Sequence, residues 1–404
     1  MASLSPFRAL RPPEPLAARV ASPPYDVVST AEARALARGN PDSFLRVSRP
    51  EIDLPEGIDE HTPPVYAKGR ENLEELVRRG VLVQDPEPRL YVYAQRMGEH
   101  RQTGLVACAS VDEYDRDLVK KHEKTRADKE DDRVRHVDAL SAHDEPVFLT
   151  YRAVPEIDRA VEDVKRAAPI YDLVTPDGVG HQLWVLPADA GRRIEALFRA
   201  VPALYVADGH HRSAAASRVH AQRKGKPGEH GAFLAVVFPD DQMQILAYNR
   251  LVRDPKGRGP EALLGALRGV MDLEAASSPR PDAPLSYGVL VGGRWWRARV
   301  RPGSYDAKDP VASLDCSIVQ DQLLAPLFGI ADPRTSKDVD FVGGIRGPEE
   351  LERRVKAEGW SLALHLFPTR IEQLLQVSDA GKLMPPKSTW FEPKLRSGLF
   401  VHGF

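Results

Sequence analysis

Apolar and polar residues alternate along this chain in short blocks, and the period of each block predicts a helix or a strand. Helices are predicted after Ser29, over 64–80, 155–168 and 192–200, and after Ser213. Strands are predicted over 90–94 and 103–111 as one hairpin, over 146–151, 182–186 and 203–207, and over 233–238 and 244–252 as a second hairpin. Because helices and strands alternate, the pattern indicates a mixed α/β fold.

A second block of elements follows a break rich in Pro, Gly and Arg at residues 254–259, which we interpret as a linker. Helices are predicted over 260–271, 314–327 and 348–358, a hairpin over 287–300, and strands over 339–342, 362–367 and 399–401. Up to residue 367 this order is typical of a small α+β sandwich. The sequence therefore predicts two domains, residues 1–253 and residues 260–404.

Composition narrows the classes of function. The formal net charge of −2 gives no global electrostatic reason to expect nucleic acid or an anionic membrane as a partner. The two cysteines, Cys108 and Cys316, are too few for a disulfide framework or a four-thiolate zinc site. No window approaches about 18 uninterrupted apolar residues, and no signal peptide precedes the first element. We therefore expect a cytoplasmic protein with a small-molecule partner, and a homo-oligomer stays open.

The segment from Asp208 to Ser213 carries the strongest chemical signal in the chain. A predicted strand ends there, Gly209 permits a sharp turn, and a helix begins with basic and hydroxyl side chains. Free backbone N–H groups and the positive end of the helix dipole attract anions, so the segment is typical of a phosphate site. Arg212 can bind phosphate through two N–H groups, and Asp208 can hold a metal or orient a histidine. The alternative is a capped turn with surface histidines.

The spacing of Gly209, Arg212 and Ala215 resembles the GxxRxxA signature of the ParB/sulfiredoxin-like superfamily, whose strand-loop-helix motif binds nucleotide phosphates. The wider chain resembles the bacterial domain-of-unknown-function family one thousand and fifteen, the HHR-motif proteins. The matching stretches are Pro23-Pro24-Tyr25-Asp26-Val27, His122-Glu123-Lys124-Thr125, Asp208-Gly209-His210-His211-Arg212, Val342-Gly343-Gly344 and 391–401. The resemblance implies a ParB/sulfiredoxin-like nucleotide-binding core. Sulfiredoxin has a cysteine where this chain has His210, which argues against sulfinic acid repair.

The resemblance also implies roles for individual residues. By resemblance, the phosphate-binding residues are Gly209, His210, His211 and Arg212. Lys124, Asp208 and Ser213 are further nucleotide-binding candidates on the chemistry of their side chains, with Asp208 also the candidate ligand of Mg²⁺. Free serine kinases of the superfamily use a carboxylate near the start of the fold as the base, and Asp26 has that position here. Glu123 is the alternative base, and His210 is a further catalytic candidate. Asp26 can instead cap a turn with Ser29, and the charged run 120–138 around Glu123 is typical of a solvated surface.

These residues predict a small-molecule phosphotransferase that uses ATP or ADP with Mg²⁺ and an amino or hydroxy acid, free serine being suggested by the resemblance. The alternatives are a ParB-like nucleotide-binding switch or DNA-associated regulatory protein, and a structural protein with a vestigial site. Several histidines could bind a metal, but no HExxH or paired CxxC motif supports this. The run from Val342 to Arg346 is interpreted as a turn that ends a strand, with backbone contact to a ligand as the alternative.

Overall fold

The structure is a computed structural model that describes residues 2–404, and the chain divides into two compact units. The first unit contains the chain up to Lys121, Thr125–Met243 and Pro393–Phe404, and the second contains His122–Lys124 and Gln244–Glu392. The predicted division into 1–253 and 260–404 differs from this one because residues 244–253 belong to the second unit and the end of the chain returns to the first. Both units combine helices with strands, so the predicted mixed α/β class is confirmed.

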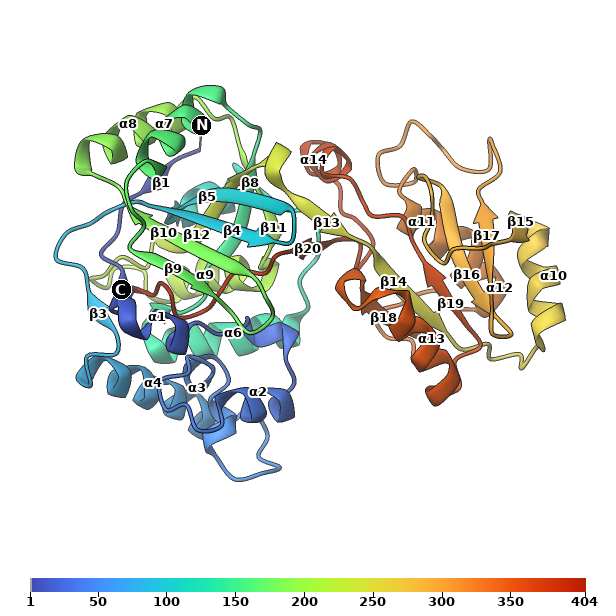
Figure 1. Ribbon diagram of the computed structural model, residues 1–404, viewed down its shortest axis with the longest axis horizontal. Coiled ribbons are helices and arrows are strands. Elements are labelled where there is room, and N and C mark those ends of the chain that lie inside the picture. The colour runs from blue at the N-terminus through green and yellow to red at the C-terminus, as the bar shows by residue number, and fades with distance from the viewer. Residues whose placement is uncertain (1) are drawn as a thin grey trace. The chain divides into compact units, whose positions relative to one another are not determined.

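A nine-stranded mixed sheet forms the centre of the first unit (Figure 1). Its order is β6 (Val119–Lys120), β11 (Leu204–Asp208), β8 (Val147–Tyr151), β12 (Ala232–Pro239), β5 (His100–Ser110), β4 (Tyr91–Met97), β10 (Gly180–Val185) and β9 (Tyr171–Val174), with β1 (Leu4–Ser5) paired to β5. β4 and β5 form the predicted hairpin around Gly98. β8 and β12 are buried along their whole length, apart from the first residue of β12, which matches their continuous apolar sequence.

Helices cover both faces of this sheet (Figure 1). On one face, α7 (Pro155–Lys165) and α8 (Ala188–Phe198) pack together and bury Ile157, Ile194 and Phe198 in the main core. On the other face, α9 (His210–Gln222) packs on β8 and β12, α6 (Ala127–Leu140) packs on α9, and α4 (Pro63–Arg78) packs on α6. The remaining elements of the unit are α1 (Glu14–Val20), α2 (Thr30–Ala37), α3 (Leu45–Ser48), α5 (Val111–Asp115), β2 (Leu10–Arg11), β3 (Val83–Gln84), β7 (Ala142–His143) and β21 (His402–Gly403). The predicted helix after Ser29 is α2, which begins with a capping box between Ser29 and Glu32.

The second unit is built on a six-stranded sheet. Its order is β15 (Asp272–Ala275), β17 (Arg294–Arg299), β16 (Ser286–Val291), β19 (Leu362–His365), β14 (Tyr248–Val252) and β18 (Val339–Gly343), and a separate pair joins β13 (Gln244–Leu246) to β20 (Trp390–Glu392). Its helices are α10 (Pro260–Val270), α11 (Asp315–Val319), α12 (Ala325–Phe328), α13 (Gly347–Glu358) and α14 (Ile371–Asp379). β16 and β17 form the predicted hairpin, with positive φ at Gly292 and Gly293 in its turn. Helix 314–327 was predicted as continuous, and it contains a π-helical segment between α11 and α12.

Two predictions around residue 250 were wrong. The second hairpin does not form, because β12 already has β5 on one edge and β8 on the other, so the strands after Pro239 pair within the second unit. The predicted linker 254–259 is a structured turn inside that unit. Asp254 is buried there and accepts hydrogen bonds from the backbone of Lys256 and Arg258, so its carboxylate holds the turn closed.

Candidate functional site

The sharp turn between β11 and α9 is the centre of the candidate site in the first unit. β11 ends at Asp208, Gly209 has a φ of +98°, and α9 begins at His210, as the sequence predicts. A Cβ on Gly209 would lie 3.0 Å from Nε of Arg212, so the position needs glycine for its backbone angle and for its contact with the guanidinium. The Ser213 N–H already donates to the Gly209 carbonyl, which leaves the earlier N–H groups of α9 as candidate anion donors.

Arg212 and Asp208 bring opposite charges to this turn. The Arg212 side chain is 8% exposed; its Nη1 donates to the carbonyl of Pro146, and its Nε has no hydrogen-bond partner within the described chain. Its Nη2 lies 3.8 Å from the Asp208 carboxylate, which also accepts a hydrogen bond of 3.1 Å from Nζ of Lys394. Burial alone would raise the pKa of Asp208, but the charges of Lys394 and Arg212 outweigh it and hold this pKa below its usual range.

Lys394 is a site residue that the sequence analysis did not name. It lies in the segment from Pro393 that returns to the first unit, and its backbone carbonyl accepts a hydrogen bond from Gln95 of β4. The signal for it was present, because 391–401 is one of the stretches that carry the family resemblance. Its ammonium group beside Asp208 places a second cation near the start of α9.

Helix α6, which packs on α9, contributes a buried charged face, although the charged run 120–138 is typical of a solvated surface. Asp132, Arg133 and His136 are all buried. Arg133 pairs with Asp132 at 2.7 Å, and its guanidinium lies 3.9 Å from the centroid of the Tyr25 ring. Nε2 of His136 lies 3.0 Å from the carboxylate of Asp144. The charges are tolerated inside the unit because each has a specific partner.

Glu145 is the second residue that sequence reasoning missed. Its Oε1 accepts hydrogen bonds from the Tyr25 backbone N–H at 3.0 Å and from the Ser397 hydroxyl at 2.8 Å. Its Oε2 is buried and, among the residues that the structure describes, has no hydrogen-bond partner. Burial and the neighbouring charge of Asp144 raise the pKa of Glu145 to about 7. A carboxyl group that titrates near neutral pH therefore lies directly against the segment that carries Asp26.

Asp26 itself is exposed and stands in the 3₁₀ turn Tyr25–Val27, after Pro24. Burial lowers the pKa of Arg212, but the carboxylates around it, Asp208 first and then Asp26, outweigh burial and raise that pKa. Asp26 thus acts electrostatically on Arg212 although the two residues are far apart in sequence. The structure brings Asp26, Asp208 and Arg212 into one electrostatic cluster.

The other predicted site residues have varied surroundings. His210 is buried, and the Ser213 hydroxyl donates back to the carbonyl of His210 at 3.1 Å. Nε2 of His211 accepts the backbone N–H of Arg126 at 3.1 Å, which ties α9 to the segment before α6. Glu123 and Lys124 belong to the second unit, so their part in a site with the residues of α9 stays a prediction.

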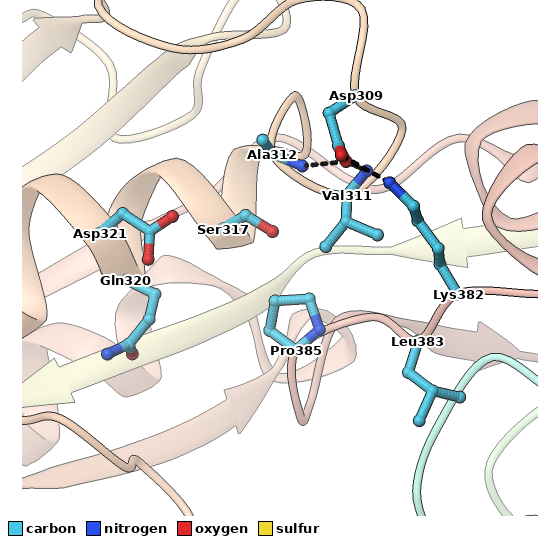
Figure 2. Close-up of a pocket in the computed structure, with 9 residues that line it drawn as sticks. All are labelled: Asp309, Val311, Ala312, Ser317, Gln320, Asp321, Lys382, Leu383 and Pro385. Carbon is cyan, nitrogen blue, oxygen red and sulfur yellow. Dashed lines mark hydrogen bonds and ion pairs between the residues drawn. The ribbon is translucent and has the colours of Figure 1, made fainter. Parts of the chain in front are cut away.

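A small cavity in the first unit and a larger one in the second are each lined by residues of a single unit. In the first unit, a space of about 30 Å³ beside Tyr25 and Arg133 is large enough for one water molecule. In the second unit, a cavity of about 560 Å³ lies beside α11, and Figure 2 shows the ion pair between Asp309 and Lys382 on one side of it. None of the predicted site residues lines this second cavity.

Neither Cys108 nor Cys316 forms a disulfide in the described part of the chain.

Similarity to known proteins completes the description. Across residues 2–404, none of the helices combines the length and the apolar character that a membrane crossing requires. No curated protein matches the chain in sequence. Among solved structures, a conserved hypothetical protein from Pyrococcus furiosus is similar at 11% identity and a TM-score of 0.38, over 74% of this chain and 95% of that chain.

Two other solved structures are similar at the same level. A mutant of a free serine kinase in complex with ADP has 11% identity and a TM-score of 0.38, over 73% of this chain and 92% of its own. SbnI with a C-terminal truncation, from Staphylococcus aureus, has 12% identity and a TM-score of 0.37, over 74% of this chain and 87% of its own. The sequence itself gives the firmer result: residues 4–317 match the family described as "Protein of unknown function (DUF1015)", and the chain belongs to that family.

Proposed function

We propose that this protein is a cytoplasmic phosphotransferase that uses ATP or ADP with Mg²⁺ to phosphorylate the hydroxyl of a small amino or hydroxy acid. The observation that carries the proposal is the start of α9. Gly209, in a left-handed conformation, opens a helix whose first N–H groups stand beside the cations Arg212 and Lys394. Such an arrangement binds phosphate oxygens, in agreement with the ParB/sulfiredoxin-like motif that the sequence resembles.

Among the carboxylates of the cluster, Asp208 is the proposed ligand of Mg²⁺. Asp208 is partly exposed and is already ionised by its cationic neighbours, so it suits a hard cation such as Mg²⁺. Mg²⁺ keeps several water ligands and usually takes only one or two carboxylates besides the phosphates, and one carboxylate is therefore a sufficient protein ligand. When bound, the ion would neutralise charge on the phosphates.

Asp26 is the base in this proposal. Its carboxylate is exposed, and its charge acts on Arg212, so it is available to a hydroxyl near the phosphate donors. The acceptor oxygen forms a bond to the terminal phosphorus as the bond to the departing nucleotide breaks, and the hydroxyl proton passes to the Asp26 carboxylate. Glu145 holds the Tyr25 backbone, and through it the turn that carries Asp26.

The test is a search for product. The full chain is incubated with ATP or ADP, Mg²⁺ and a pool of amino and hydroxy acids including serine, and ³¹P NMR and mass spectrometry identify any new phosphate ester. Asp26→Asn should keep nucleotide affinity and lower turnover by roughly 10² to 10⁴, the usual effect of losing a general base. Glu123→Gln is the matched variant, and a loss confined to it transfers the role of base to Glu123.

A negative result distinguishes between the alternative functions. If the protein binds nucleotide but forms no phosphorylated product, the phosphotransferase proposal is replaced by that of a nucleotide-binding switch. The absence of both binding and product would remove the phosphate role of α9.

A further inference from the structure

A cleft of about 390 Å³ in the second unit combines aromatic rings with arginines. β14 contributes Tyr248, β18 contributes Phe341, and β20 contributes Trp390, while Arg346 comes from the turn between β18 and α13. The end of β18 and this turn form the run Val342 to Arg346, for which the sequence offered backbone contact with a ligand as an alternative to a turn that ends a strand. None of these residues belongs to the site proposed at the start of α9.

The aromatic wall of the cleft is rigid. The Tyr248 ring meets Trp390 edge-on at a centroid distance of 5.2 Å and Phe341 at 5.9 Å. A Cβ at Gly343 would lie 2.7 Å from the indole of Trp390, so the glycine allows the indole to lie directly on the end of β18. The indole is half-buried and lines the cleft, which leaves part of its surface for a planar ligand.

Three arginines and one acid line the cleft. Arg353 pairs with Glu350 at 2.7 Å, and Arg354 pairs with Asp340 and with Glu358 at 2.7 Å each, so these two arginines are neutralised by acids. The hydrogen bond from Arg353 lowers the pKa of Glu350, so this acid is ionised and its charge is neutralised within the lining. Arg346 is exposed and forms no ion pair within residues 2–404, although its charge helps to lower the pKa of Glu350.

We propose that this cleft binds a planar aromatic group that carries an anionic substituent, as in a nucleoside monophosphate, with the ring against Trp390 and the anion at Arg346. A ring without charge leaves Arg346 without a partner, and an anion without a ring leaves the aromatic surface exposed to water. Both halves of the ligand are therefore needed for full affinity. The site does not depend on the function proposed for α9.

The full chain labelled with 5-fluorotryptophan reports binding at this position by ¹⁹F NMR. The protein has five tryptophans, and Trp390→Phe assigns the signal of Trp390. AMP, adenosine and ribose 5-phosphate are titrated separately as ring plus anion, ring alone and anion alone. We expect AMP to shift the Trp390 signal at a concentration at least about tenfold lower than either partial probe.

Two further variants localise the effect. Arg346→Gln should raise the AMP concentration for a half-maximal shift by about tenfold, whereas Arg334→Gln should leave it unchanged, because Arg334 is exposed, pairs with Asp332 and lies outside the cleft. Arg212→Ala should also leave the Trp390 titration unchanged. The proposal is overturned if AMP leaves the Trp390 signal unmoved, if adenosine shifts it equally well, if Arg346→Gln has no effect, or if Arg212→Ala abolishes the shift.

Discussion

Helices α6 and α13 look alike in sequence, since both are short, rich in charged residues of both signs and poor in apolar ones. Their charges nevertheless have different surroundings. In α13, Arg353 has a side chain that is 58% exposed, and it pairs with Glu350 one turn away. In α6, Arg133 has a side chain that is 8% exposed, and its charge interacts with Asp132, Asp144 and Glu145. Charge density therefore does not distinguish a solvated helix from a buried one.

What separates the two helices is how they are packed: α6 lies between two other helices, whereas α13 packs on strands of its sheet. α6 lies between α4 and α9 in the first unit, so the face that carries Asp132 and His136 is buried. Tyr66 of α4 donates to Asp132 at 2.9 Å, which gives this carboxylate a partner from a neighbouring helix. α13 packs through Pro348 and Leu351 and leaves Arg353 exposed at the surface.

Removal of the buried arginine should have the largest effect on stability. Arg133→Met keeps an apolar stem of similar length but leaves Asp132, Asp144 and Glu145 without a shared cation. The free energy of unfolding should fall by about 3 to 5 kcal/mol, the usual cost of breaking a buried ion pair from one side. Urea denaturation at pH 7 measures it. If Arg133→Met unfolds at the same urea concentration as the parent, the charges of α6 are not coupled as described.

The pH dependence of stability should isolate Glu145. Its pKa is raised from the ordinary 4.5 to about 7, so between these values the folded protein holds a proton that the unfolded chain has lost. The free energy of unfolding contributed by this group therefore falls as the pH rises through this window, by roughly 3 kcal/mol in total. Glu145→Gln should remove that slope and be more stable than the parent above pH 7. Urea titrations from pH 4.5 to 8 compare the two, and equal slopes would contradict the assignment.

Features with local determinants could be predicted from the sequence, and features that depend on distant neighbours could not. The turn from β11 to α9 was predictable because its determinants are local: a strand end, Gly209 and a basic helix start within a few residues. Glu145 and Lys394 were not, because their partners are distant along the chain. The Lys394–Asp208 contact spans 186 residues, and the Glu145–Ser397 contact spans 252. No periodicity encodes such pairs. The buried face of α6 was missed for the same reason, since only its neighbours make it buried.

Helix α9 carries both a buried and an exposed arginine. Arg212 is buried at the proposed phosphate site, whereas the Arg218 side chain is 40% exposed and pairs with Glu130 and Asp131. Arg212→Ala should weaken the binding of ADP by about 1.5 to 3 kcal/mol, the range for a hydrogen bond to a charged group. Isothermal titration calorimetry measures the affinity, and circular dichroism checks the fold. Arg218→Ala is the matched control and should bind like the parent. Equal affinities for all three proteins would remove Arg212 from phosphate binding.

The smallest effect on stability is expected for an exposed arginine of α13. Arg353→Met on α13 makes the same chemical change as Arg133→Met on α6, but the side chain it replaces is solvated and its partner Glu350 stays accessible to water when left alone. Exposed ion pairs of this kind contribute little, because solvent screens the attraction and holding two long side chains together costs entropy. We expect the same urea midpoint as the parent at low salt and in 0.5 M NaCl. A marked loss of stability in Arg353→Met, comparable to that of Arg133→Met, would mean that burial does not separate the two helices.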